Sequence, residues 1–224
     1  IIYLSFNNDL RSLNQNISNS FRENLLPLYI LNQIILKNKK NIKIVYTSTA
    51  SLYSNNIKLP AKEKSKIKIN NIYEFLKHSS EQILIKSNNR YLDYQILRLS
   101  NVYGENTSKY SQNNRQVLTR VIQDAFYKKE INVFGTGNYY RDFVHVYDVC
   151  NAINKIILRN YSKNAIYNIA SGKKLKLIDI FKEIKNFINK NYNISIKIKK
   201  IKTKKNNLNL SDFRNFQASI SKAK

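Results

Sequence analysis

The stretch Ile42-Lys-Ile-Val-Tyr-Thr-Ser-Thr-Ala-Ser51 decides the fold of this chain. Its first half is apolar and β-branched, which is typical of a buried strand, and its second half carries a cluster of hydroxyl groups. Helical patterns precede it over residues 21–36 and follow it over residues 73–85. A buried strand between two helices is the repeating unit of a parallel sheet, so this stretch predicts an α/β fold.

The same alternation continues on both sides of this stretch. Further strands are expected over residues 1–5, 94–99, 131–134 and 166–169, and further helices over residues 117–126, 148–158 and 177–188. In a parallel sheet, ligands bind beyond the carboxyl ends of the strands. The hydroxyl-rich residues after Tyr46 and the pair Ser100-Asn101 occupy such ends, so we expect a functional site there.

The chain of 224 residues carries 39 Lys and Arg against 14 Asp and Glu, which gives a formal net charge of +25. Such a charge fits nucleic-acid binding. However, the chain is also rich in Asn, Ile and Tyr and poor in Gly, Pro and Trp, which is the pattern of an A/T-rich genome. The lysines are scattered, except over residues 197–205, where they alternate with isoleucines as in an edge strand. We therefore expect genome bias, and not a nucleic-acid partner, to explain the charge.

Several classes of protein are disfavoured by what the sequence lacks. No run of 18 apolar residues is present, so no membrane partner is expected. The single cysteine, Cys150, fits a reducing compartment, and we expect a cytoplasmic protein. No metal site is expected, because Cys150 has no ligand spacing to either histidine. We interpret Cys150 as buried and inert, His145 as structural, and Asp148 as the cap of its helix.

The beginning of the chain, Ile1-Ile-Tyr-Leu-Ser5, has neither an initiating Met nor a polar lead-in. We expect a buried strand that is cut from its predecessor, and therefore a fragment of a longer protein. The first glycine is Gly104, so the sequence has no G-x-G-x-x-G loop for a phosphate.

Tyr73 and Lys77 lie four residues apart in a helical segment, and therefore one turn apart on one face. A Lys ammonium beside a phenol stabilises the phenolate and is expected to lower its pKa. Such a Tyr can take the proton of a substrate hydroxyl while hydride leaves the same carbon. The hydroxyl of Thr49 could hold that substrate hydroxyl in line. This spacing alone carries little weight, because pairs like it arise by chance in a chain so rich in Tyr and Lys.

The neighbouring segments strengthen the pair. The chain resembles the extended short-chain dehydrogenase/reductase group, and within it the NAD-dependent epimerase/dehydratase family, which acts on nucleotide sugars. The resembling segments follow the family's order over almost the whole chain: Ile2-Tyr-Leu-Ser5, Asn24, Val45-Tyr-Thr-Ser-Thr-Ala-Ser-Leu-Tyr53, Tyr73-Glu-Phe-Leu-Lys77, Glu81-Gln-Ile-Leu84, Leu97-Arg-Leu-Ser-Asn-Val-Tyr-Gly104, Phe134-Gly-Thr-Gly137, Arg141-Asp-Phe-Val-His-Val146 and Tyr167-Asn-Ile-Ala-Ser-Gly172.

The resemblance implies NAD as the cofactor, with NADP as an alternative, and a nucleotide sugar as the substrate. Its implied site residues are catalytic Thr49, Tyr73 and Lys77, cofactor-binding Leu4, Ser5, Asn24, Thr47, Tyr73 and Lys77, and substrate-binding Asn101 and Arg141. The Arg would bind the diphosphate, although a pair with Asp142 or a surface acid is the alternative. A homodimer is left open as a further partner.

The resemblance also implies how the chain is divided. Residues 1–110 would form the remainder of a Rossmann-like parallel sheet, truncated at its N-terminal side, with the catalytic helix. Residues 111–224 would mainly form a smaller α/β substrate-binding domain, and the chain would cross back to the sheet near residues 131–170. About two βαβ-sized units of the family would be absent.

The residues after Thr49 bear on the reaction. Dehydratases of the family place an acid pair there, whereas this chain has Ala50 and Ser51. We therefore expect an epimerase or a reductase and not a dehydratase. The alternative is a non-catalytic member of the same fold that binds a nucleotide or a partner.

Overall fold

Four parallel strands form the main sheet of the computed structural model, in the order β1 (Ile2–Tyr3), β2 (Ile42–Thr49), β3 (Leu92–Leu99) and β8 (Ala165–Ile169). The structure describes all residues except 88, 106–116, 160–163, 202–212 and 224. β2 pairs with β3 along its whole length, from Ile42 opposite Leu92 to Thr49 opposite Leu99. The predicted parallel α/β sheet is confirmed.

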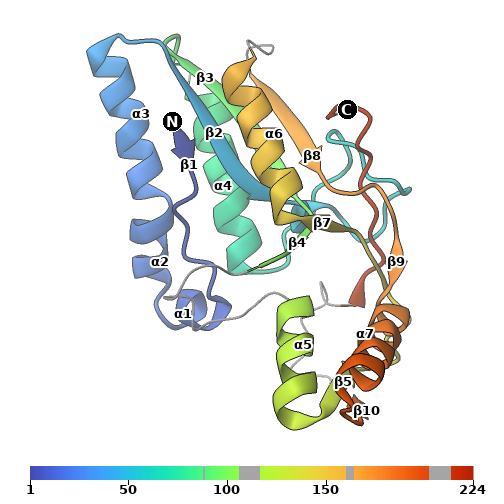
Figure 1. Cartoon of the computed structure of the whole chain (residues 1–224). Helices are drawn as coiled ribbons and strands as arrows, with labels where there is room; N and C mark the ends of the chain where they lie inside the picture. Colours follow the sequence, from blue (N-terminus) through green and yellow to red (C-terminus); the bar gives the residue numbers. More distant parts are fainter. Residues whose placement is uncertain (88, 106–116, 160–163, 202–212, 224) are drawn as a thin grey trace.

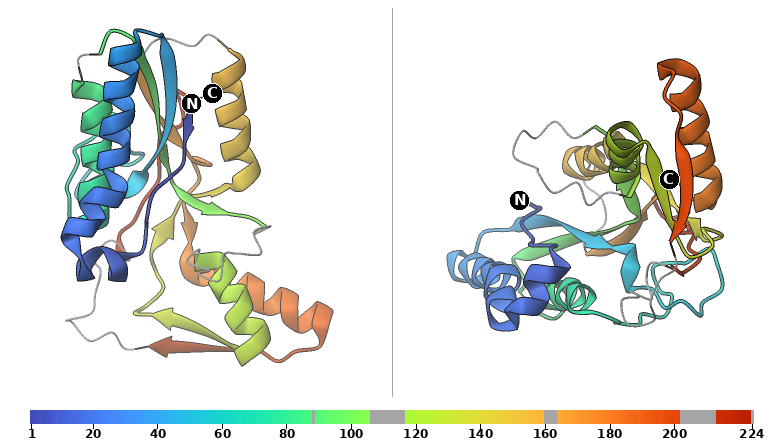
Figure 2. Two further views of the ribbon diagram at one scale, coloured as in Figure 1. Left: turned by 90° about the vertical axis from the view of Figure 1, so that its left-hand side faces the viewer. Right: turned by 90° about the horizontal axis from the view of Figure 1, so that it is seen from below.

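Helices cover both faces of this sheet (Figure 1 and Figure 2, left). On one face, α3 (Leu26–Asn38) and α4 (Ile72–Lys86) pack on Ile44 and Tyr46 of β2. On the other face, α6 (Val146–Leu158) packs on Val45 of the same strand. Successive side chains of a strand point to opposite faces, so the apolar run of β2 supplies both cores.

A smaller unit lies beyond the carboxyl ends of the sheet strands (Figure 1). It consists of α5 (Val117–Lys128), β5 (Glu130–Phe134), α7 (Leu177–Tyr192) and β10 (Lys197–Ile201), with β10 parallel to β5. The lysine-rich strand that the sequence predicts is therefore present in β10, while residues 202–205 of that cluster lie outside the described residues. The division into domains at residue 110 stays a prediction.

Short elements connect the sheet with the smaller unit. β4 (Asn101–Tyr103) pairs with β7 (Phe143–His145), and β6 (Tyr140–Arg141) pairs with β9 (Leu175–Lys176). Before β2, the helices α1 (Leu10–Gln15) and α2 (Ile17–Asn24) lead into α3, and the short 3₁₀ helix η1 (Ala50–Leu52) follows β2. The remaining strands and helices start and end within a few residues of their predicted bounds.

Four predictions about local structure are wrong. The strand at the beginning of the chain is not buried, since Ile1, Ile2 and Leu4 are 52%, 46% and 60% exposed. The single helix expected over residues 21–36 is two helices that meet at Leu25. Pro27 lies in the first turn of α3, where a backbone N–H has no partner within the helix, so its missing N–H costs no hydrogen bond there. The cap of α6 is His145, whose Nδ1 accepts from the Tyr147 N–H at 3.3 Å, and Asp148 lies inside the first turn. Cys150 is exposed and not buried, since it lies on the solvent side of α6.

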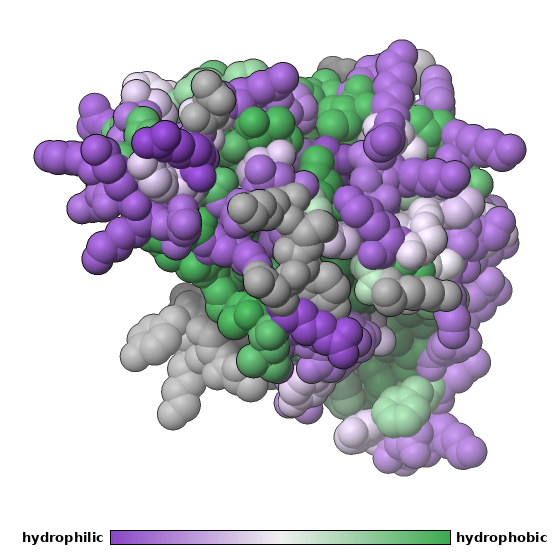
Figure 3. All heavy atoms as spheres, turned by 90° about the horizontal axis from the view of Figure 1, so that it is seen from above, coloured by the Kyte–Doolittle hydropathy of each residue, from purple (hydrophilic) through white to green (hydrophobic). Residues whose placement is uncertain are grey.

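The surface view agrees with the expectation that hydrophilic side chains are scattered over the molecule and do not form a single patch. On the face seen from above, hydrophilic side chains project on both sides and apolar side chains appear between them (Figure 3). In the described part of the chain, no helix is both long and apolar enough to cross a membrane.

Candidate active site

The hydroxyl cluster of the sequence occupies the carboxyl end of β2 and the turn that follows it. Thr49 is the last residue of β2 and caps η1. Its Oγ1 accepts a hydrogen bond from the Ser51 N–H at 3.1 Å and donates one to the Ser51 Oγ at 3.0 Å. The threonine hydroxyl is therefore held by the turn, at the edge of the sheet where ligands bind in parallel folds.

Tyr73 reaches this hydroxyl from the first turn of α4. The helix begins at Ile72 because the side chain of Asn71 accepts from the Glu74 N–H at 2.9 Å, which is an N-cap. Burial raises the pKa of the Tyr73 phenol, while its hydrogen bond with Thr49 lowers that pKa and the charge of Glu74 raises it further. The structure thus brings together Thr49 and Tyr73, as the sequence predicts.

Lys77 lies one turn after Tyr73, and its ammonium is aimed elsewhere than predicted. Its Nζ donates to the Thr47 carbonyl at 2.8 Å and lies 3.8 Å from the centre of the Phe6 ring. Burial lowers the pKa of Lys77 to about 7, although the charge of Glu81 raises it. The prediction that Lys77 lowers the pKa of Tyr73 is wrong for this structure, because desolvation of the phenol dominates.

Phe6 is a site residue that the sequence analysis missed. Its ring contacts the Tyr73 ring edge to face, with centroids 5.7 Å apart, and also covers the Lys77 ammonium. It therefore shields both groups from water at once. Its position directly after the first strand is the signal that could have found it, since that strand end lies at the same edge of the sheet as Thr49.

A buried ion pair lies beneath the site. Arg98 of β3 makes a bidentate contact with Glu81 of α4, at 2.9 Å from Nε and 2.7 Å from Nη2. Both side chains are buried, and the Ser48 hydroxyl donates to Glu81 at 2.6 Å. The pair fixes α4, and with it Tyr73 and Lys77, against β2 and β3.

The predicted cofactor residues occupy different environments. Leu4 and Ser5 are exposed at the end of β1. Asn24 is completely buried, where its Oδ1 accepts from the Asn7 N–H at 2.7 Å and its Nδ2 donates to the Ser20 carbonyl at 2.9 Å. Asn24 thus holds the segment after β1 in place. A direct contact of these residues with a cofactor stays a prediction.

The predicted substrate residues come together through neighbouring strands. The Asn101 side chain donates to the Asp142 carbonyl at 2.9 Å, so it lies beside the residue that follows Arg141. The buried Asp142 carboxylate accepts from the N–H and hydroxyl of Ser171, at 2.9 and 2.8 Å, and from the Ala218 N–H at 3.1 Å. Burial raises the pKa of Asp142, and these hydrogen bonds lower it.

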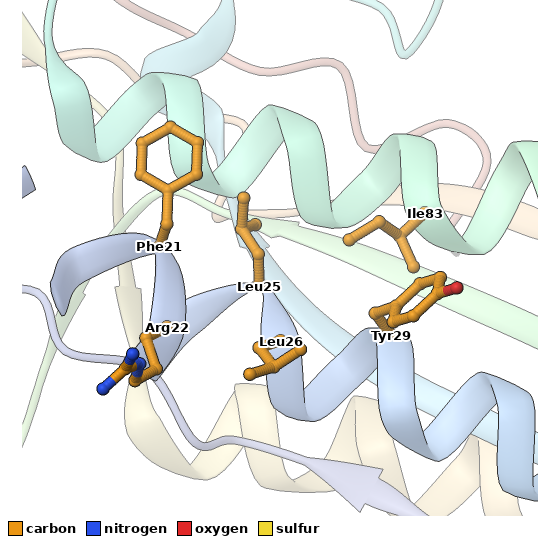
Figure 4. A pocket seen from close by; sticks show the side chains of 6 residues that line it. All are labelled: Phe21, Arg22, Leu25, Leu26, Tyr29 and Ile83. Atoms are coloured by element: carbon orange, nitrogen blue, oxygen red, sulfur yellow. The ribbon is translucent and has the colours of Figure 1, made fainter. Parts of the chain in front are cut away.

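A groove lies apart from this chemistry. Phe21, Arg22, Leu25, Leu26, Tyr29 and Ile83 line it, with a cavity volume of about 340 Å³ (Figure 4). Its walls are α2 and α3 on one side and α4 on the other. The groove is mainly apolar, and none of the residues that line it is among Thr49, Tyr73 and Lys77, so it is not part of the catalytic constellation.

Comparison with known proteins places this site in a family context. The model of the NAD dependent epimerase/dehydratase family matches residues 7–170. A protein of Methanocaldococcus jannaschii named "Putative UDP-glucose 4-epimerase" is 34% identical over 148 residues, which are 65% of this chain and 47% of that protein. The ADP-L-glycero-D-manno-heptose-6-epimerase of Brachyspira hyodysenteriae is 28% identical over 155 residues, 65% of this chain and 46% of that protein. The chain spans about half the length of these curated relatives.

Solved structures share the fold. The UDP-N-acetylglucosamine 4-epimerase of Methanobrevibacter ruminantium superposes with a TM-score of 0.82 at 22% identity, over 99% of this chain and 67% of that one. The UDP-glucose 4-epimerase of Thermotoga maritima superposes with a TM-score of 0.81 at 22% identity, over 99% and 68%.

Proposed function

The chain belongs to the NAD-dependent epimerase/dehydratase family, and from this premise we propose that the protein moves a hydride and a proton at a hydroxyl-bearing carbon of a nucleotide sugar. The observation that carries the proposal is the placement of Thr49 at the carboxyl end of β2, with Tyr73 in the first turn of α4 near its hydroxyl and Lys77 buried one helical turn later. A hydroxyl, a phenol and an amine at that edge are the groups that such a reaction needs.

The residues present fit the reacting end of a nicotinamide cofactor, NAD or alternatively NADP. The ammonium of Lys77 has three N–H donors, and within the described residues the Thr47 carbonyl is its only hydrogen-bond acceptor. Donors are therefore left for the hydroxyls of a ribose. When bound, such a cofactor supplies the place to which the hydride leaves and from which it returns. A glycine loop for its phosphates is not part of this sequence before Gly104.

The side chains of this chain divide the proton chemistry among them. Thr49 orients the sugar hydroxyl, and Tyr73 takes the proton of that hydroxyl at its phenolic oxygen or gives it back. Burial raises the pKa of Tyr73, which favours the protonated phenol over the phenolate. The Phe6 ring excludes water from Tyr73 and Lys77, which strengthens every charge interaction between them and a bound substrate.

The substrate is proposed to be a nucleotide sugar whose diphosphate lies toward Arg141 and Asn101. Both residues stand on strands that join the sheet to the smaller unit, and an Arg recognises phosphate oxygens with two parallel hydrogen bonds. Relatives named as epimerases of UDP- and ADP-sugars support this class. Epimerisation or reduction is favoured over loss of water, because Ala50 and Ser51 follow Thr49 and supply no carboxylate.

The test is Tyr73→Phe in the protein as its gene encodes it. We expect turnover with a panel of sugar nucleotides to fall by about 10²–10⁴-fold, since the variant has no proton to exchange. Tyr94→Phe is the matched control, because it removes a phenol from the other end of the sheet and should keep activity. Unchanged turnover in Tyr73→Phe would contradict the proposal, and retained sugar-nucleotide binding without turnover in the parent protein would favour the non-catalytic alternative.

We further propose that the groove on α2, α3 and α4 is covered by a second copy of the chain. Its rim exposes Phe21, Leu26, Tyr29 and Phe75 to between 38% and 50%, which is unusual for side chains so close together on a lone subunit. Two neighbouring helices, α3 and α4, can pack on the same two helices of a second copy across a two-fold axis. The same apolar face of each copy would then be buried by that of the other.

The oligomeric state tests this interface. Tyr29→Glu places a charge at the groove and should convert a dimer to a monomer in sedimentation velocity. Tyr127→Glu is the control, because Tyr127 is 85% exposed on α5, far from the groove, and should leave the dimer intact. A parent protein that sediments as a monomer at micromolar concentration would overturn the interface.

A further inference from the structure

The described C-terminal segment, residues 213–223, sends one charged side chain to the turn that carries Thr49. The guanidinium of Arg214 donates to the carbonyl oxygens of Ala50, Ser51 and Tyr53, each at 3.1 Å. These carbonyls belong to η1 and its end. The Ala50 carbonyl also accepts from the Tyr53 N–H at 3.3 Å, while the carbonyls of Ser51 and Tyr53 lie at the end of the short helix, where partners within a helix run out. A cation at the carboxyl end of a helical turn also meets the favourable end of its dipole.

The chain around Arg214 is itself held firmly. The Arg214 guanidinium lies 4.8 Å from the centre of the Phe216 ring, and Phe216 stacks on Tyr53 with centroids 6.0 Å apart. Phe216 is buried, and its N–H donates to the Tyr140 carbonyl at 3.0 Å. Two residues later, the Ala218 N–H donates to the buried Asp142 carboxylate. These contacts hold the backbone around Arg214 in place, and with it the position of the guanidinium against η1.

The turn that Arg214 grips is the same turn that sets the Thr49 hydroxyl. Thr49 Oγ1 accepts from the Ser51 N–H, and Arg214 binds the Ser51 carbonyl on the other side of the same residue. A shift of Ser51 would carry the Thr49 hydroxyl with it and would lengthen the bond from that hydroxyl to Tyr73. A displacement of this kind costs much in catalysis even when no reacting group is changed.

We propose that Arg214 is a positioning residue of the proposed reaction, which clamps the η1 turn so that the Thr49 hydroxyl stays in line with Tyr73. The inference rests on the proposed function and adds a residue from the far end of the chain to its site. The planar fork of Arg is suited to this role, because its separate N–H groups reach three carbonyls at once. Lys keeps the charge but presents its donors from a single atom.

The first experiment compares Arg214→Lys and Arg214→Met with the parent protein in the turnover assay. We expect kcat to fall by about 10–100-fold in Arg214→Met and less in Arg214→Lys, with KM changed little, because the geometry of the reacting groups is altered and substrate contacts are kept. Arg120→Met is the matched control, since Arg120 is exposed on α5 and should leave kcat unchanged. Loss of thermal stability with an unchanged kcat would overturn the positioning role.

The second experiment reads the turn without turnover. In ¹³C-tyrosine NMR, with the Tyr73 signal assigned by its loss in Tyr73→Phe, both Arg214→Met and Thr49→Val should raise the pKa of Tyr73. The first variant lets the Thr49 hydroxyl move out of line, and the second removes that hydroxyl. The double variant should show no further rise, since both changes break one interaction. Additive shifts, or a Tyr73 signal indifferent to Arg214→Met, would overturn the clamp. Unchanged turnover in Tyr73→Phe would instead refute the proposed function. The titration would still show whether Arg214 positions the Thr49 hydroxyl, because it does not depend on turnover.

Discussion

The main sheet and the smaller unit have cores of opposite character. The core around the sheet includes the buried side chains of Lys77, Glu81, Arg98, Asp142 and Asn168. In the smaller unit, the buried side chains among the described residues are all apolar: Val121, Ala125, Ile131, Val133, Phe181, Ile188 and Ile196. Both regions follow from an alternation of strands and helices, so the difference is not one of fold class. Buried charge lies where chemistry is proposed, whereas the other region is packed mainly by apolar side chains, with the Asn132 Oδ1 as a buried polar atom among them.

The polar core of the sheet region specifies geometry more than it adds stability. A buried bidentate pair such as Arg98 and Glu81 gains little over apolar side chains of the same shape, because both charges lose their hydration. Its hydrogen bonds, however, allow only one position of α4 on the sheet. Since α4 carries Tyr73 and Lys77, fixing the helix also fixes the positions of these two side chains at the site.

The largest effect is expected from breaking this pair. Glu81→Leu leaves the Arg98 guanidinium buried without its counter-charge, and the free energy of unfolding should fall by about 3–5 kcal/mol. Urea unfolding followed by circular dichroism measures the loss. The double variant Glu81→Leu with Arg98→Met is the control, and it should recover most of the stability. A single variant as stable as the parent would remove the contrast between the two cores.

A smaller effect is expected from pH, and only through the sheet region. Burial lowers the pKa of Lys77 from 10.5 to about 7 in the folded chain. Between these values the unfolded chain binds a proton that the folded chain does not, so stability rises with pH. Below pH 7 both states are protonated and this dependence ends.

The slope from Lys77 is at most about 1.4 kcal/mol per pH unit, and Lys77→Met should remove it. Urea unfolding at pH 7, 8 and 9 in parent and variant measures the difference. Equal slopes in the two proteins would show that Lys77 titrates in the folded chain as it does in water.

The smallest effect is expected in the apolar unit. Ile188→Val removes one buried methylene from α7, and the free energy of unfolding should fall by about 0.5–1.5 kcal/mol. The loss should be the same at pH 7 and pH 9, because no titratable group is buried against this side chain among the described residues. A loss that changes with pH would mean that the two cores are coupled and not independent.

Local pattern was enough to predict the parts that repeat. The apolar run at Ile42 predicted β2, and the spacing of Tyr73 and Lys77 predicted one helix face. The break at Leu25 was missed because Pro27 was read inside a helix and not in its first turn. The exposure of Cys150 was missed because a single thiol in an apolar helix has no periodic partner that reveals its side.

The sequence by itself determined the alternation of strands and helices and the order of the hydroxyl, phenol and amine along the chain, because these depend on neighbours a few residues apart. Only the tertiary structure decided that the Lys77 ammonium faces the Thr47 carbonyl and the Phe6 ring, and that Arg214 grips the turn after Thr49. Arg214 and Ala50 are 164 residues apart, and no local period links such positions. Their contact exists because the sheet, the loop after β2 and the C-terminal segment pack on one another, so that the carbonyls of the turn accept hydrogen bonds from the Arg214 guanidinium.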